Sequence, residues 1–213
     1  MVEFLLLGLY DWVGGRIRRV LTARYGKPSR AIARQARQEF KLLIRRLPDI
    51  GGLRNSRMQL VAAAALFLAL YRPLRARGIA VEEIGAVIGE VVGAAYDAFP
   101  PFLLRLYGGL YFTRSAVRRA EKAALGSQER RYAGDWVFRF VAGNGEFDWG
   151  VDYVECGIIK FFQREGAEEF TPTMCGLDWL ASERFGWGLQ RTCTLASGGE
   201  RCDFRFRRAA RDD

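Results

Sequence analysis

"DWVFRFVAGNGEFDWGVDYVE", residues 135–155, decides the fold because it alternates bulky apolar and polar side chains. Phe138 and Phe140 share one face of its first half, and Trp149 and Tyr153 share one face of its second half. A period of two is typical of a strand with one buried face. The Gly-Asn-Gly between the halves supplies hairpin turn residues. The stretch therefore predicts two antiparallel strands.

The chain after this hairpin predicts two short helices, at about 157–165 and 172–184. Two further strands are expected at about 188–195 and 202–208, joined by a Ser-Gly-Gly turn. The order is thus hairpin, two helices, hairpin. We expect an α+β fold in which a helical N-terminal part packs with an antiparallel sheet of two hairpins.

The first 127 residues have the texture of helices. The apolar run "LVAAAALFLALY" at 60–71 has 12 residues, whereas a membrane-spanning helix needs about 20, so it predicts a buried core helix and no membrane contact is expected. The expected helices cover 29–47, 57–77, 81–97 and 111–125. We expect one compact unit with a helical part (1–127), an α+β part (128–208) and a tail (209–213).

The net charge of +9 comes from arginines that repeat at helical spacing, which favours solvated helix faces. Nucleic-acid binding is the least favoured interpretation, because no zinc-finger or helix-turn-helix pattern accompanies the charge. The N-terminus lacks a basic leader and a cleavage site, so we expect a cytoplasmic protein with reduced cysteines. The apolar "FLLLGLY" near the N-terminus fits burial against a second copy, in a homo-oligomer, as well as burial within the chain.

Histidine is absent from the chain. This excludes Cys-His and Ser-His-Asp catalysis and any histidine-ligated metal site. The cysteines and nearby carboxylates are therefore the candidate catalytic groups that we consider.

The first two of the four cysteines are placed for chemistry. Cys156 lies where a strand turns into a helix, so nearby amides are expected to lower the pKa of its thiol, while Glu155 would oppose that shift or act as a base. Cys175 follows an expected helix start at Thr171, and Asp178 lies three residues on, along the same helix face. Asp178 is therefore a candidate general base or orienting group.

The other two cysteines have several interpretations. Alternation places Cys193 and Cys202 on strand faces, where a free cysteine packs as a small apolar residue. The cysteine spacings contain no Cys-x-x-Cys pair, so they do not match a zinc finger. Cys156, Cys175 and Cys202 could still converge with an acidic residue around zinc. Core packing, metal binding and thiol catalysis stay open at this point.

Three segments resemble the L-2-amino-thiazoline-4-carboxylic acid hydrolase family. They are "YVECGIIKFF", "FTPTMCGLDW" and "LQRTCTLASGGERCDFRF", and the likeness covers about residues 147–206. A fainter likeness links the late Gly-x-x-x-Cys hairpin to the 4-vinyl-reductase domain, a small-molecule-binding module that can hold zinc. The residues that match the hydrolase family's motifs are Tyr153, Glu155, Cys156, Cys175, Asp178, Thr194, Gly199, Cys202, Asp203 and Phe204.

The resemblance implies a small cytoplasmic hydrolase that opens a cyclic amidine ring at a carbon–nitrogen bond. Catalysis would use Cys175 with Asp178, and Cys156 and Glu155 are the other candidates. The substrate would be a small anion whose carboxylate Arg191 or Arg205 could hold. Tyr153 and Thr194 complete the expected binding site. No cofactor is expected, and zinc is the alternative. The alternative function is a non-catalytic small-molecule-binding module with structural or zinc-bound cysteines.

Overall fold

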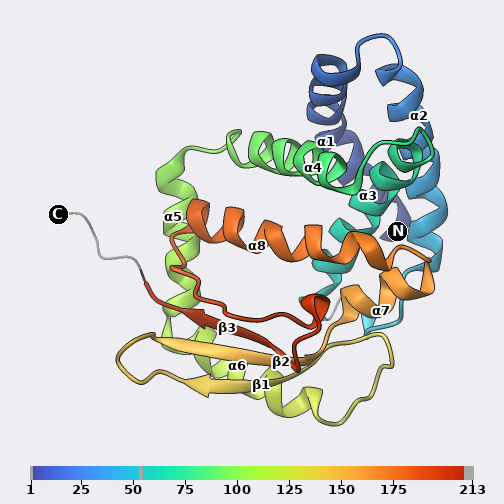
Figure 1. Cartoon of the computed structure of the whole chain (residues 1–213). Coiled ribbons are helices and arrows are strands. Elements are labelled where there is room, and N and C mark those ends of the chain that lie inside the picture. Colours follow the sequence, from blue (N-terminus) through green and yellow to red (C-terminus); the bar gives the residue numbers. More distant parts are fainter. Residues whose placement is uncertain (1, 53–54, 209–213) are drawn as a thin grey trace.

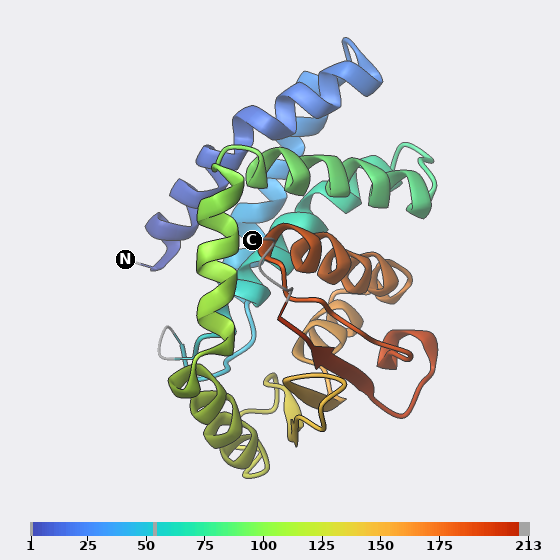
Figure 2. The same cartoon turned by 90° about the vertical axis from the view of Figure 1, so that its left-hand side faces the viewer.

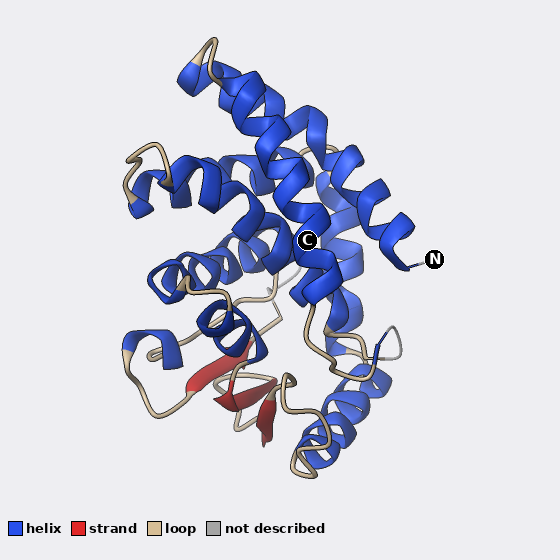
Figure 3. Ribbon diagram, turned by 90° about the vertical axis from the view of Figure 1, so that its right-hand side faces the viewer, coloured by secondary structure: helices blue, strands red, loops and turns tan. Residues whose placement is uncertain are grey.

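The computed structural model describes residues 2–52 and 55–208, in which helices precede and surround a small sheet (Figure 1). The predicted tail at 209–213 lies outside the described residues. Figure 3 shows the strands gathered at one end of the molecule and most of the helices at the other. The expected α+β fold is confirmed.

Helix α3 (Met58–Arg75) is the apolar element on which its neighbours pack. Every side chain from 64 to 71 is buried, and α3 contacts α2 (Ser29–Leu43), α4 (Val81–Tyr96) and α7 (Gly157–Arg164). A helix that is apolar all round needs such cover on every side. The predicted core helix is confirmed, although Leu60 in its first turn is exposed.

Helix α1 (Val2–Tyr25) pairs with α2 in a hairpin at the N-terminal end of the chain. The amphipathic pattern expected over 29–47 is present, with Ile32, Phe40 and Leu43 buried. The α-helix ends at Leu43, however, and a short 3-10 helix η1 (Ile44–Arg46) follows it.

Two helices, α1 and α5, were absent from the expected set. Helix α5 (Pro101–Gly109) begins at the second residue of the Pro-Pro pair, because proline is well tolerated in the first turn of a helix. A 3-10 helix η3 (Leu110–Phe112) connects it to α6 (Arg114–Ser127). The Thr113 hydroxyl accepts a hydrogen bond from the Ala116 amide and caps α6.

The sheet has three antiparallel strands in the order β1-β2-β3. They are β1 (Val137–Ala142), β2 (Trp149–Glu155) and β3 (Cys202–Phe206). The register places Tyr153 opposite Phe138 on one side and Cys202 on the other. These three residues therefore share one sheet face, which also carries Phe204 and Phe206.

The second predicted hairpin is wrong in its first arm. Residues 188–195 form no strand, and only one isolated bridge, from Gln190 to Arg205, joins this segment to the sheet. A side chain takes the place of a neighbouring strand here, because the Asp203 carboxylate accepts hydrogen bonds from the backbone amides of Thr192 and Cys193. The chain then enters a 3-10 helix η5 (Leu195–Ser197) before β3.

The remaining helices lie in the chain between β2 and the loop at residues 188–195. Helix α7 starts directly after Cys156, and a short 3-10 helix η4 (Glu168–Phe170) leads into α8 (Thr171–Phe185). In Figure 1, α8 runs above the sheet on the side of β3. The two short predicted helices are therefore confirmed within one residue at each end.

In the described part of the chain, no single helix is long and apolar enough to cross a membrane. The bent pair formed by α4 and Pro101–Phe112 passes the same length and composition test together.

Gly108 allows α5 to approach α8. A Cβ atom at this position would lie 1.9 Å from the Phe185 carbonyl oxygen. We expect Gly108→Ala to lower the free energy of unfolding by about 1–3 kcal/mol, because the two helices would have to separate. Urea unfolding followed by circular dichroism measures this change.

The matched control is Gly126→Ala in α6, where a Cβ atom would meet nothing within 4 Å. This substitution should leave stability unchanged or raise it by up to about 1 kcal/mol. Equal losses in the two variants would contradict the close packing of α5 on α8.

Candidate active site

Three cysteines and one carboxylate converge between α8 and the sheet. Cys156 lies between β2 and α7, Cys202 begins β3, and Cys175 lies on α8 with Asp178. They are close enough that the negative charge of Asp178 raises the pKa of all three thiols. The structure thus brings together four residues that lie up to 46 positions apart in the sequence.

An ion pair between a buried guanidinium and a partly exposed carboxylate lies at the centre of this cluster. The Arg191 guanidinium donates from Nη1 to Asp178 Oδ2 at 2.7 Å and from Nη2 to the Cys175 carbonyl at 2.9 Å. The same guanidinium lies 5.0 Å from the ring centre of Phe204 on β3. Arg191 thus ties α8 to the sheet through one side chain.

Asp178 is crowded by protein but open to solvent. Burial raises the pKa of its carboxyl group to about 6, against the opposing effect of the Arg191 charge. Even so, 41% of its side-chain surface is accessible, compared with 6% for Arg191. Asp178 is therefore ionised at neutral pH, can accept a proton near that pH, and can be reached by water or a small molecule.

Burial has the opposite consequence for the thiols. It raises the pKa of Cys175 to about 12, with Asp178 adding to the shift, and that of Cys202 to about 11. The Leu195 amide donates to the Cys202 sulfur at 3.2 Å, which opposes the shift without reversing it. Both residues are neutral thiols at pH 7.

The expected activation of Cys156 by helix amides is wrong in direction. Cys156 does precede the first residue of α7, and the amides of Ile158 and Ile159 favour its thiolate. Burial is the larger effect and raises the pKa. For Cys175 the helix start differs as well, because Phe170 is the N-cap and Cys175 lies in the second turn of α8, where the helix dipole has faded.

Aromatic rings surround the polar centre. Tyr153 packs against Phe138 and Phe204, with ring centres 5.2 and 5.4 Å apart, and its burial raises the pKa of the phenol. Tyr111, from η3, stacks on Trp187 at 4.7 Å. Burial raises the pKa of its phenol to about 12, and the Asp178 charge adds to the shift. Tyr111 was absent from the expected site, because nothing in its local sequence links it to a segment 67 positions away.

Asp203 holds the loop that carries Arg191. It accepts the Thr192 amide at 2.9 Å, the Thr192 hydroxyl at 2.6 Å and the Cys193 amide at 2.8 Å. Burial opposes its ionisation, but these hydrogen bonds prevail and lower its pKa to about 2. Its contribution to stability is present above about pH 4 and is lost as the pH falls towards 2.

Three expected site residues are placed elsewhere. Glu155 is paired with Lys160 at 2.6 Å and with Arg130. The Thr194 hydroxyl caps η5 and lies 2.8 Å from the Ser197 hydroxyl. Arg205 lies on the opposite face of the sheet from Tyr153 and pairs with Asp152 at 2.8 Å.

Arg191 lies at the site, where it was expected. Its Nη1 atom is bonded to Asp178 and its Nη2 atom to the backbone of Cys175, and the side chain is only 6% exposed. In this structure its guanidinium therefore holds Asp178 in place.

Residues 2–52 and 55–208 contain no group of three or more cysteine, aspartate, glutamate or histidine side chains that could hold a metal ion. The alternative zinc set of Cys156, Cys175 and Cys202 is therefore not assembled as a ligand set.

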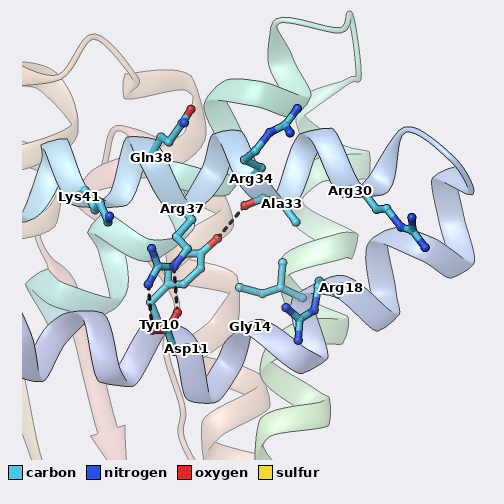
Figure 4. A pocket seen from close by; sticks show the side chains of 11 residues that line it. Tyr10, Asp11, Gly14, Arg18, Arg30, Ala33, Arg34, Arg37, Gln38 and Lys41 are labelled. Carbon is cyan, nitrogen blue, oxygen red and sulfur yellow. Dashed lines mark hydrogen bonds and ion pairs between the residues drawn. The ribbon is translucent and has the colours of Figure 1, made fainter.

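A groove of about 620 Å³ lies apart from this cluster, between α1 and α2. Figure 4 shows Arg37 of α2 paired with Asp11 of α1 across it, while Arg18, Arg30 and Arg34 also line the groove. None of its lining residues belongs to the cysteine cluster.

A family model described as L-2-amino-thiazoline-4-carboxylic acid hydrolase matches residues 59–206, more than half of the chain. The match includes every residue of the cluster around Asp178. Comparisons with curated proteins and with solved structures found no match.

The raised pKa values predict slow thiol chemistry. We expect iodoacetamide to modify Cys175 and Cys202 slowly at pH 7, with rates that grow about tenfold per pH unit towards pH 11, because only the thiolate reacts. Peptide mapping by mass spectrometry gives the rate at each cysteine.

The reference for these rates is the same reaction in urea, where the unfolded chain has ordinary thiol pKa values. Modification of Cys175 in the folded protein at pH 7 as fast as in urea would contradict the assignment of a neutral thiol.

Proposed function

The chain belongs to the L-2-amino-thiazoline-4-carboxylic acid hydrolase family, and from this we propose that it hydrolyses a cyclic amidine of the 2-aminothiazoline-4-carboxylate type with Asp178 as the general base. The family's name is that of a hydrolase acting on a thiazoline carboxylate. The observation that carries our assignment is the Asp178 carboxyl group, which has a pKa of about 6 and stays open to solvent.

The reaction begins with water at the amidine carbon. The oxygen of the water bonds to that carbon while Asp178 takes a proton from the water, and a tetrahedral intermediate forms. The ring nitrogen takes this first proton from Asp178. The added hydroxyl group then gives its own proton to Asp178 as a carbonyl group forms, and Asp178 passes this second proton to the nitrogen as the bond from carbon to nitrogen breaks. One water is consumed, the nitrogen leaves as an amine that carries both of the water's protons, and the product is a cysteine with the carbamoyl group on its sulfur.

In this scheme the cysteine thiols line the substrate site and do not act as nucleophiles. With pKa values of about 12 and 11, Cys175 and Cys202 hold their protons at neutral pH. Attack by a thiolate would first require removal of that proton, whereas Asp178 is already ionised. We therefore assign the cysteines, with Tyr153 and Phe204, to the wall that receives the substrate's ring.

Arg191 acts as a positioning residue in this scheme. Its charge lowers the pKa that burial would otherwise raise further, and its two hydrogen bonds hold Asp178 and the α8 backbone together. Asp203 supports Arg191 in turn by fixing the adjacent loop.

The first test compares the carboxylate with the thiols. We expect Asp178→Asn to lower kcat by about 10²- to 10⁴-fold, because the amide of asparagine cannot accept the proton that the carboxylate takes from water. Cys175→Ser and Cys156→Ser should each lower kcat by less than tenfold. Such a loss lies within the range of about 1–2 kcal/mol expected for a change in packing. Turnover of 2-aminothiazoline-4-carboxylate, followed by chromatography, provides the rates.

Loss of activity in Cys175→Ser with activity retained in Asp178→Asn would overturn this assignment in favour of thiol catalysis. Binding of the compound by the unmodified protein without any turnover would support the alternative function, a small-molecule-binding module.

The second test is the pH profile. Activity should rise with pH through an apparent pKa of about 6, since the base must be ionised. Arg191→Gln removes the charge that favours ionisation, so the same limb should move to higher pH. Arg205→Gln, which changes an arginine on the other sheet face, should leave the limb in place. An unshifted limb in Arg191→Gln would argue against Asp178 as the titrating base.

A further inference from the structure

The outward side of α5 is apolar and open to solvent. Phe102 is 68% exposed and Leu106, one turn later, is 66% exposed. Side chains four residues apart share a helix face, so these two form the centre of a patch. We call the patch the α5 face and define it by Trp12, Phe99, Phe102, Leu103, Leu106 and Leu110, all of which are exposed.

The inner side of the same helix is already used. Leu104 is buried, and Gly108 lies against the Phe185 carbonyl of α8. Helix α5 is thus apolar on both sides, which is the pattern of a helix covered on both sides. Isolated exposed apolar residues are ordinary, but a contiguous group of this size marks a surface that contacts something else.

The α5 face continues onto α1. The rings of Trp12 and Phe99 are 6.1 Å apart, and the Arg16 guanidinium lies 4.2 Å from the Trp12 ring. Figure 2 looks at this side of the molecule and shows α5 in front, with α1 beside it and α6 below. Two helices therefore present apolar side chains on one side of the protein.

Basic residues predominate around this patch, and the two carboxylates at its edge, Asp11 and Asp97, are paired with Arg37 and Arg184. Between residues 99 and 120 the charged residues are Arg105, Arg114, Arg118 and Arg119, with no acidic residue among them. None of these four has an ion-pair partner within the described ranges. Helix α1, which contributes Trp12 to the patch, carries four arginines (Arg16, Arg18, Arg19 and Arg24) against two acidic residues.

An apolar patch bordered by arginines favours one kind of partner for the α5 face. Two copies meeting through the α5 face would bring like charges together, which disfavours a homodimer there. An anionic lipid surface complements both features, because apolar side chains enter the boundary of the acyl chains while arginines meet the headgroup phosphates. We propose that the α5 face docks on a membrane surface that carries anionic lipids, with the protein lying on the bilayer.

Vesicle binding tests this contact on the full chain. Cosedimentation is measured with vesicles of phosphatidylcholine alone and of phosphatidylcholine with phosphatidylglycerol. We expect binding to the anionic vesicles, weaker binding as salt is raised, and little binding to the neutral ones. The double variant Phe102→Ser, Leu106→Ser should lower the vesicle affinity by at least about tenfold, since it removes two inserted side chains.

The matched control is Leu42→Ser, which removes an equally apolar side chain that is 52% exposed on α2 and outside the α5 face. This variant should bind vesicles as the unmodified protein does. Circular dichroism of each variant reports whether it is folded. As a second measurement, anionic vesicles should shift tryptophan fluorescence to the blue, and Trp12→Phe should remove most of that shift.

Three outcomes would overturn the proposal. The first is binding to neither kind of vesicle. The second is vesicle binding that the double variant leaves unchanged, which would assign the contact to charge alone. The third is a dimeric mass in solution that the double variant converts to a monomer, which would show that a second copy covers the α5 face.

Discussion

The buried guanidinium of Arg191 is the interaction on which the C-terminal part of the chain depends. It joins the side chain of Asp178, the backbone of Cys175 and the ring of Phe204, and so links α8 to β3. A buried cation without partners is costly, so the loop that carries Arg191 must be placed accurately. The Asp203 carboxylate does this by accepting two backbone amides and one hydroxyl group.

This arrangement separates the roles of groups that look alike in the sequence. Asp178 and Asp203 both follow a cysteine within three residues, yet burial raises the pKa of one to about 6 and hydrogen bonds lower that of the other to about 2. One is thereby suited to proton transfer and the other to holding structure. The cysteines share the crowded surroundings of Asp178, and for a thiol those surroundings favour the neutral form.

Much of the fold could be predicted from local patterns. The alternation at Phe138, Phe140, Trp149 and Tyr153 identified two strands, and helical spacing identified α3, α7 and α8. The first arm of the second hairpin was misjudged, because residues 188–195 alternate like a strand but find their backbone partners in a side chain from β3. Helix α5 is absent from the predicted helices because its two apolar sides show no amphipathic period.

For the site, the sequence by itself determined which chemistry is available: no histidine, and a cysteine and an aspartate three positions apart on one helix. Its motifs also identified the family. Only the tertiary structure decided that Arg191 pairs with Asp178 while Arg205 and Glu155 are engaged elsewhere. It also decided that the thiols are neutral and that Tyr111 joins them. The reason is physical: residue type and spacing set what a group can do, whereas burial and distant charges set its pKa and its partners, and both arise only when remote segments meet.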